Sequence, residues 1–284
     1  MPLDNFHVFA PAKINLFLHI TGKRGNGYHT LQSLMAFVTA GDSLEFLMQE
    51  GFQIEVRGPF AAAMPVSQDN LIYKAARLLS GEYGVPLQGK IILTKNLPVA
   101  SGIGGGSADA AAALKGLAKL WSLPENPPRL QGMAQQLGAD VPACLDGRTV
   151  WTEGIGEVLT PLPDVPDLHL VLVNPLIPTA TAEVFKKFCA GFSSSLPIPK
   201  ERGMALAELL SCRNDLTAAS TTVTPAVRDV LEALMQTQNC LLQRMSGSGA
   251  TCFGLYENAA VAKAAAKTIK NNHPDWWVMP AGQS

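Results

Sequence analysis

The spacing of hydrophobic and polar residues predicts strands and helices that are mixed along the whole chain. Residues 12–20 alternate strictly, so that Ile14 and Leu16 fall on one side of an extended chain and Lys13 and Asn15 fall on the other. A period of two residues indicates a β-strand. Further strands are expected at residues 43–47, 52–56, 90–94, 149–151, 157–160, 168–173, 241–245, 251–256 and 276–279.

Helical spacing occurs between these strands. Helices are expected at residues 70–79, directly after residue 106, just before residue 138, and at residues 181–188, 224–235 and 259–270. Thr181 is expected to cap its helix with its hydroxyl group. Strands and helices mixed in both halves predict an α+β fold, with helices on one face of each sheet.

A proline-rich segment at residues 161–167 has no periodic pattern, and such a segment is typical of a domain boundary. We therefore expect an N-terminal domain over residues 1–163 and a C-terminal domain over residues 164–284. The length of 284 residues is sufficient for two domains of ordinary size.

The stretch Gly102–Ser107 carries the clearest chemical signal, because it reads Gly-Ile-Gly-Gly-Gly-Ser and an alanine-rich segment follows it. Glycines allow backbone N–H groups to approach a ligand closely. A helix that begins there adds unpaired N–H donors and the positive end of its dipole, which together favour phosphate. The stretch lacks the lysine of a Walker loop and has Ser107 where a dinucleotide loop has its last glycine. A flexible glycine turn is the alternative interpretation.

Other candidate residues are weaker when each is taken alone. Lys13 is a possible catalytic cation or simply a solvated strand residue, and Asp140 is a possible base or simply a turn residue. The segment Ser246–Thr251 reads Ser-Gly-Ser-Gly-Ala-Thr, which suits either close backbone approach to a ligand or an ordinary hairpin. Tyr28 and His29 lie beside glycines, where a ring can stack on a nucleobase and an imidazole can hydrogen-bond its edge.

Composition narrows the classes of function. The net charge of −1, from 22 Lys and Arg against 23 Asp and Glu, offers no basic footprint for nucleic acid. Five scattered cysteines without a Cys-x-x-Cys pair favour reduced thiols over a disulfide framework or a zinc site. No apolar run has the length of roughly 18 residues that a membrane span needs, and the first residues lack a signal-peptide pattern. We expect a cytoplasmic protein with neither a nucleic-acid partner nor a membrane partner.

The order of the motifs is more informative than any one of them. Ala-Lys-Ile-Asn-Leu begins at residue 12, Pro-x-x-x-Gly-Ile-Gly-Gly-Gly-Ser at residue 98, Gly-Ala-Asp-Val-Pro at residue 138 and Ser-Gly-Ser-Gly-Ala at residue 246. This order resembles the motifs of the GHMP small-molecule kinases. With Gly-Tyr-His after the first motif, the chain is most similar to the branch of that family that phosphorylates a cytidylyl methylerythritol in the non-mevalonate isoprenoid pathway. The resemblance covers essentially the whole chain.

The resemblance implies a fold, a reaction and a set of site residues. The implied fold has an N-terminal domain like domain 2 of ribosomal protein S5 and a ferredoxin-like C-terminal domain. The implied reaction transfers the γ-phosphoryl group of ATP to the 2-hydroxyl of the substrate, with Asp140 as the catalytic aspartate and Lys13 as its partner. The residues implied to bind the phosphates of ATP are Pro98, Val99, Ala100, Ser101, Gly102, Ile103, Gly104, Gly105, Gly106, Ser107 and Ala108. The residues implied to hold the cytidine end of the substrate are Asn15, Tyr28, His29, Thr181 and Phe185.

Mg²⁺ is the cofactor expected with ATP, and Ser107 is a candidate ligand. The loop departs from the usual family pattern at Ala100, Ser101 and Ala108, where glycine, alanine and a second serine are common. Ala100 is acceptable only if its φ is not positive. Ser246 replaces a frequent threonine and keeps the hydroxyl group.

Three alternative functions stay open. Another kinase of the family, of the homoserine or mevalonate type, is the alternative within the class. A catalytically inactive nucleotide sensor and an RNA-binding module are the alternatives outside it. The sequence does not fix the oligomeric state, for which a monomer or a weak homodimer is expected.

Overall fold

A computed structural model describes residues 5–64, 69–163, 168–201 and 203–284. The chain forms two compact units, the first from Met1–Ala12, Gly41–Val99 and Gly104–Gly147, and the second from Lys13–Ala40, Ala100–Ile103 and Arg148–Ser284. The domain boundary expected after residue 163 borders residues 164–167, which lie outside the described residues, so that division stays a prediction.

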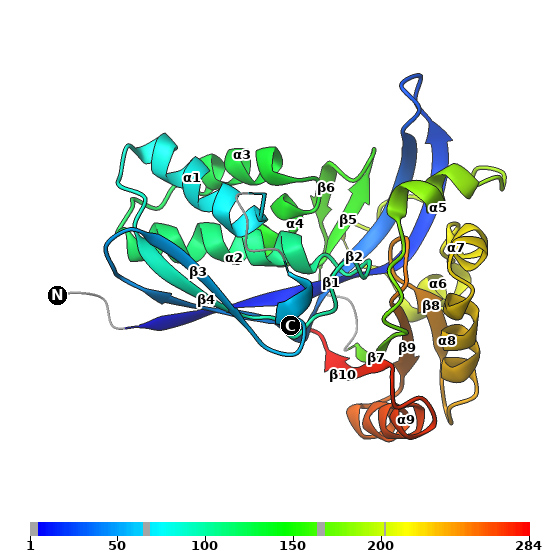
Figure 1. Ribbon diagram of the computed structural model, residues 1–284. Coiled ribbons are helices and arrows are strands. Elements are labelled where there is room, and N and C mark those ends of the chain that lie inside the picture. The colour runs from blue at the N-terminus through cyan, green and yellow to red at the C-terminus, as the bar shows by residue number, and fades with distance from the viewer. Residues whose placement is uncertain (1–4, 65–68, 164–167, 202) are drawn as a thin grey trace. The chain divides into compact units, whose positions relative to one another are not determined.

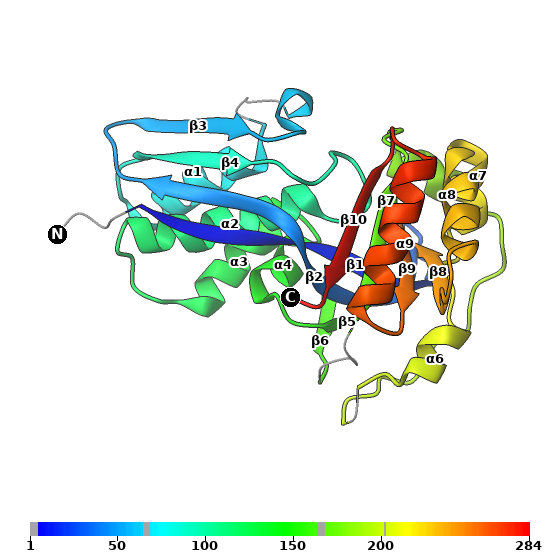
Figure 2. The same cartoon turned by 90° about the horizontal axis from the view of Figure 1, so that it is seen from below.

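The sheet of the first unit is covered by helices on one face (Figures 1 and 2). Strand β3 (Phe52–Arg57) runs parallel to β4 (Gly89–Thr94), and β4 runs antiparallel to the end of β2 (His29–Leu47), which pairs with β1 (Phe6–Lys23). The short 3-10 helix η1 (Ala61–Ala63) follows β3. The helices are α1 (Leu71–Tyr83), α2 (Gly105–Leu120), α3 (Pro127–Leu137) and α4 (Val141–Asp146).

Helix α2 packs very closely on this sheet. A Cβ atom at Gly116 would lie 2.1 Å from the ring of Phe46 on β2, so that only glycine permits this contact. The alanines that follow Ser107 are buried along the helix. The close contact fixes the axis of α2 against the sheet, and with it the direction in which its first turn points.

The second unit contains an antiparallel sheet in the order β10-β7-β9-β8. Its strands are β7 (His169–Asn174), β8 (Leu242–Met245), β9 (Cys252–Tyr256) and β10 (Trp277–Gly282). Helices α8 (Ala226–Met235) and α9 (Ala259–Asn272) pack on this sheet (Figure 2), and Val173, Val230 and Ala266 belong to the core between them. The other elements of the unit are β5 (Val150–Glu153), β6 (Val158–Pro161), α5 (Thr181–Lys187), α6 (Leu206–Ser211) and α7 (Thr217–Val223).

The mixture of strands and helices confirms the predicted α+β class, but several elements differ from their expected form. Strands β1 and β2 are much longer than predicted, and every residue from 13 to 20 is buried. The interpretation of Lys13 as a solvated strand residue is therefore wrong, because both faces of β1 are covered there. The turn expected around Asp140 leads directly into α4, a helix of only 6 residues, which is too short to show helical periodicity.

Candidate functional site

A buried polar group lies on one side of β1 in the second unit. The Lys13 Nζ atom donates to Asn15 Oδ1 at 2.9 Å, and Asn15 Nδ2 donates to Ser33 Oγ on β2 at 2.8 Å. Lys13 is 6% exposed and Asn15 is 2% exposed. Burial of an ammonium group is costly unless it is hydrogen-bonded, so the orientation of Asn15 and the burial of Lys13 depend on each other.

The turn Ser246–Thr251 connects β8 to β9 and lies beside that group. The Asn15 backbone N–H donates to Ser246 Oγ at 3.0 Å, and Ser246 Oγ donates to the Gly102 carbonyl at 3.3 Å. The Thr251 N–H donates to the Ser101 carbonyl at 3.1 Å. One serine hydroxyl therefore joins the first strand, the glycine stretch and this turn, which lie far apart in the sequence.

The glycine stretch belongs to both units, since residues 100–103 fall in the second and Gly104 onward in the first. Within the second unit, a Cβ atom at Gly102 would lie 2.6 Å from the Gly249 carbonyl oxygen, and φ at Gly102 is +78°. Glycine is therefore required at position 102 both by space and by backbone conformation.

In the first unit, the stretch becomes the first turn of α2. Gly104 occupies the N-cap position with φ of +67°, no side chain caps the helix, and the first turn contains no acidic residue. The first intrahelical bond joins the Ala108 N–H to the Gly104 carbonyl at 2.9 Å. The N–H groups of Gly105, Gly106 and Ser107 precede that bond, and such groups are the usual donors to an anion at a helix start.

Ala100 does not have the negative φ that was expected for an alanine at this position. Its φ is +51°, in the left-handed region where a Cβ atom is unfavourable. The expectation that an alanine at this position requires a negative φ is therefore wrong for this loop. Backbone bonds on both sides, from Lys13 N to the Ile103 carbonyl at 3.0 Å and from Thr251 N to the Ser101 carbonyl, hold the loop in place despite the strain.

A group of three charged side chains lies directly beneath the first turn of α2. Lys95 Nζ donates to Asp42 Oδ2 at 2.5 Å and to Asp109 Oδ2 at 2.8 Å, and all three side chains are at most 2% exposed. Burial by itself lowers the pKa of Lys95, but the carboxylates of Asp109 and Asp42 outweigh it and raise that pKa above its usual value. Burial raises the pKa of Asp109 to about 7, against the opposing effect of the Lys95 ammonium.

Sequence reasoning missed this group, although two signals were present. Lys95 begins the segment that leads into the glycine stretch, seven positions before Gly102, and Asp109 is an ionisable residue in front of four consecutive alanines. An ionisable side chain within an apolar run is usually buried with a partner. Asp42 has no such signal in the sequence, because only the pairing of β2 with β4 brings it to Lys95.

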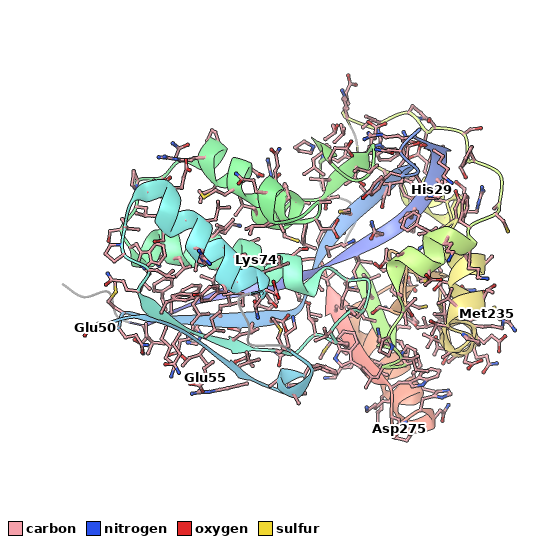
Figure 3. The ribbon with its side chains drawn as sticks, turned by 45° about the horizontal axis from the view of Figure 1, so that its top comes forward. His29, Glu50, Glu55, Lys74, Met235 and Asp275 are labelled. Carbon is pink, nitrogen blue, oxygen red and sulfur yellow. The ribbon has the colours of Figure 1, made fainter. Side chains whose placement is uncertain are left out.

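His29, labelled in Figure 3, is the first residue of β2 and contacts two aromatic rings of the second unit. The His29 ring stacks on Phe185 of α5, with centroids 5.5 Å apart and planes inclined by 27°, and meets Phe188 edge-on at 5.5 Å. Burial, followed by the nearby Lys23 ammonium, lowers the pKa of His29 below its usual value. The structure therefore brings together His29 and Phe185, two of the residues expected at the cytidine end.

The other residues expected there have different surroundings. Thr181 is the first residue of α5 and does not cap it, since Ala180 occupies the N-cap position and no side chain caps the helix. The expectation that Thr181 is a cap is wrong, because its hydroxyl lies 2.8 Å from Ser248 Oγ in the turn between β8 and β9. Tyr28 lies in the turn between β1 and β2 and is 61% exposed, so its ring is accessible to a ligand.

Comparison with known proteins identifies the family. The family model of the GHMP kinases N terminal domain matches residues 70–148, and that of the GHMP kinases C terminal matches residues 198–275. A 4-diphosphocytidyl-2-C-methyl-D-erythritol kinase of Paramagnetospirillum magneticum is 51% identical over 98% of this chain and 99% of its own length. A protein of the same name from Cereibacter sphaeroides is 46% identical over 96% of this chain and 97% of its own. This protein belongs to the GHMP kinase family.

Solved structures agree with this assignment. A crystal structure of 4-(cytidine 5'-diphospho)-2C-methyl-D-erythritol kinase has a TM-score of 0.83 and 29% identity, over 98% of this chain and 100% of that one. A homoserine kinase from Cytophaga hutchinsonii, with a TM-score of 0.71 and 18% identity over 100% of this chain and 97% of that one, shares the fold. The two-domain α+β fold of the GHMP kinases is thus confirmed, and the protein is a small-molecule kinase.

In this GHMP kinase, the two residues expected at the reaction centre belong to different units. Lys13 lies in the second unit, and Asp140 lies in the first, at the N-cap position of α4. Helix α4 packs on α2 and α3, so Asp140 is placed by the same helical layer that places the first turn of α2. That Asp140 and Lys13 act together stays a prediction.

In residues 5–64, 69–163, 168–201 and 203–284, no group of three or more His, Cys, Asp and Glu side chains could hold a metal ion. Over the same ranges, no helix is long and apolar enough to cross a membrane.

Proposed function

We propose that this GHMP kinase transfers the γ-phosphoryl group of ATP to the 2-hydroxyl of 4-(cytidine 5'-diphospho)-2-C-methyl-D-erythritol, a step of non-mevalonate isoprenoid precursor biosynthesis. Relatives that carry the name of this activity match almost the whole chain at 51% and 46% identity. The structural observation that supports it best is the stack of His29 on Phe185, together with the exposed ring of Tyr28, the residue before His29 in the chain. Aromatic rings of this kind suit a nucleobase such as cytosine.

The polar groups near these rings suit the rest of the acceptor. Thr181 is one helical turn before Phe185 on α5, and its hydroxyl contacts Ser248 of the turn that also holds Asn15 through Ser246. The amide of Asn15 and the ammonium of Lys13 lie on the same side of β1. We assign Asn15 and Thr181 to binding the acceptor, and Lys13 to stabilising the charge on the group that is transferred.

The ATP end is assigned to the loop from Pro98 to Ala108. Three N–H groups at the start of α2 can donate to the phosphate oxygens, and the helix dipole favours their negative charge. Mg²⁺ in phosphoryl-transfer sites is held mainly by phosphates and water, with one or two protein oxygens. The absence of a larger acidic cluster among the described residues fits a metal that arrives with ATP, and Ser107 in the first turn of α2 is the proposed protein ligand. Such an ion neutralises charge on the phosphates.

We assign Asp140 to the acceptor hydroxyl. In phosphoryl transfer most of the acceleration comes from positioning and from stabilising charge, and a carboxylate contributes by orienting the hydroxyl and accepting its proton late. The assignment requires the Asp140 carboxylate and the Lys13 ammonium to face the same reacting group during the reaction.

A coupled assay of ADP release tests the proposed function directly. We expect ADP release from ATP that depends on the cytidylyl substrate and that mevalonate and homoserine neither support nor inhibit. ADP release with mevalonate or homoserine instead would assign the protein to another branch of the family. A gel shift with RNA, reduced steeply by added salt, would instead support a nucleic-acid-binding module.

Two further expectations accompany this proposal. The cytoplasm is the proposed compartment, because the five cysteines form no disulfide. A monomer or weak homodimer is the proposed oligomeric state, which light scattering across a range of protein concentrations checks.

A further inference from the structure

The buried charged group formed by Lys95, Asp42 and Asp109 has no role in the function proposed above. Its position beneath the first turn of α2 suggests that it has one. Its ammonium lies between two carboxylates that are fully buried in the first unit. Replacing such a group by apolar side chains is often neutral for stability. The position of the group next to the glycine loop therefore needs an explanation other than stability alone.

Asp42 holds the chain that leads into the glycine loop. Its Oδ1 atom accepts hydrogen bonds from the backbone N–H groups of Asn96 at 2.6 Å and Leu97 at 2.9 Å, while its Oδ2 accepts from Lys95 Nζ. Three donors from consecutive residues thus meet one carboxylate on β2. This fixes the direction of the chain immediately before Pro98.

Lys95 holds the start of α2. A Cβ atom at Gly105 would lie 3.1 Å from Lys95 Nζ and 3.7 Å from Asp42 Oδ2, so the first helical residue rests directly on the ammonium and its partner. Lys95 also reaches one turn further along α2, to Asp109 Oδ2. The Lys95 Nζ atom thereby fixes the first turn of the helix relative to the chain that leads into the glycine loop.

The two carboxylates are not equivalent. Asp42 accepts three of these hydrogen bonds through both oxygens, whereas Asp109 accepts one from Lys95, and its Oδ1 atom has no partner in the described part of the chain. The pKa of Asp109 of about 7 agrees with this difference, because a carboxyl group with one partner and full burial readily takes up a proton.

We propose that Lys95 and Asp42 are positioning residues for ATP. They hold the first turn of α2 and the chain that leads into the glycine loop at the distance that the phosphates require. Asp109 completes the buried group in either protonation state. This rests on the ATP-binding role given to the loop under the proposed function. Neither residue needs to touch ATP, since both act through the backbone that they hold.

The test measures binding of the ATP analogue AMP-PNP with Mg²⁺ by titration calorimetry on the full chain, and separately the KM of the cytidylyl substrate. The variants are Asp42→Asn, which turns an amide N–H₂ toward the ammonium, and Lys95→Arg, which keeps the charge but is too large for the space beneath Gly105. Asp109→Asn imitates the protonated acid. Glu55→Gln is the control, because it removes a partly exposed ion pair with Lys90, 2.7 Å long, on strands β3 and β4 of the same unit (Figure 3).

We expect Asp42→Asn and Lys95→Arg to weaken AMP-PNP binding by roughly tenfold or more, because the loss of one backbone hydrogen bond to a charged phosphate has an effect of about this size. The KM of the cytidylyl substrate stays near the wild-type value in both variants, and Asp109→Asn and Glu55→Gln leave AMP-PNP binding unchanged. A purely structural role predicts lower thermal stability without this division between nucleotide and acceptor.

The proposal is overturned if folded Lys95→Arg binds AMP-PNP as the wild type does, or if the acceptor KM rises as much as the AMP-PNP dissociation constant. Near-ultraviolet circular dichroism establishes that each variant is folded, and Lys95→Arg decides the matter if Asp42→Asn does not fold. The calorimetry requires no acceptor. A wild-type protein that binds AMP-PNP but ignores the cytidylyl substrate would therefore contradict the proposed function and leave this inference standing.

Discussion

Gly102→Ala tests whether the glycine stretch and the turn between β8 and β9 depend on contact at a single glycine. The added Cβ atom would lie 2.6 Å from the Gly249 carbonyl oxygen and 2.8 Å from the Ser246 carbonyl oxygen. Both obstacles are backbone atoms, which cannot rotate away as a side chain can. The turn or the loop must therefore move.

The expected magnitude follows from two effects. A φ of +78° costs an alanine about 1 to 2 kcal/mol relative to a right-handed conformation. Forcing extra atoms into a filled space typically costs a further 1 to 3 kcal/mol or so. Gly147→Ala is the matched control, because Gly147 has φ of +74° but nothing within 4 Å of its added Cβ atom. Gly147→Ala therefore has the conformational cost of a positive φ without the steric cost of a filled space.

Denaturant unfolding of the wild type and both variants measures these costs, and the KM for ATP is measured alongside. We expect Gly147→Ala to lose only the conformational part, and Gly102→Ala to lose roughly 2 to 5 kcal/mol of unfolding free energy and to raise the KM for ATP. Equal losses in the two variants would refute the reasoning, because the steric contact would then contribute nothing. Unchanged ATP kinetics in Gly102→Ala would refute the link between this contact and the phosphate loop.

Three further predictions concern catalysis and the acceptor. Asp140→Asn keeps the size of the side chain and removes its charge, so kcat is expected to fall by about 10²- to 10⁴-fold with little change in the KM for ATP; a kcat near the wild-type value eliminates Asp140 as the base. Tyr28→Ala is expected to raise the KM of the cytidylyl substrate and leave both the KM for ATP and the melting temperature unchanged, because the ring is 61% exposed; the opposite KM pattern contradicts the assignment. Burial, followed by the Lys23 ammonium, lowers the pKa of His29 below its usual value, so the imidazole is mostly neutral at neutral pH and gains a proton as the pH falls through the lowered value. The KM of the cytidylyl substrate is therefore expected to be constant near neutral pH and to rise at acidic pH, and the absence of that rise in steady-state kinetics from neutral to acidic pH would exclude a role for the neutral ring.

Much of the fold could be predicted from local pattern. The helix behind the glycines, the hairpin of β8 and β9, and α8 and α9 occur close to their predicted places, and the strand predicted from residue 12 lies within the longer β1. Helices α4, α6 and α7 were missed because a period is hard to recognise in only 6 or 7 residues, although α5, which also has 7 residues, was predicted. Whether the polar side of β1 faces water stayed open, because periodicity reports which residues alternate and not what covers each side.

The sequence by itself determined the chemistry that this protein carries: a glycine stretch that begins a helix, a lysine in a strand, an aspartate before Val-Pro, and their order as motifs of the GHMP kinases. These features depend on residue type and local spacing, which can be read directly from one amino-acid sequence. The tertiary structure decided which of these residues share surroundings. Ser246 joins β1 to the glycine stretch, His29 stacks on Phe185, and Asp42 reaches Lys95. The physical reason is that hydrogen bonds, ring contacts and buried ion pairs act over a few ångströms in space, and tertiary packing, rather than separation along the chain, sets those distances.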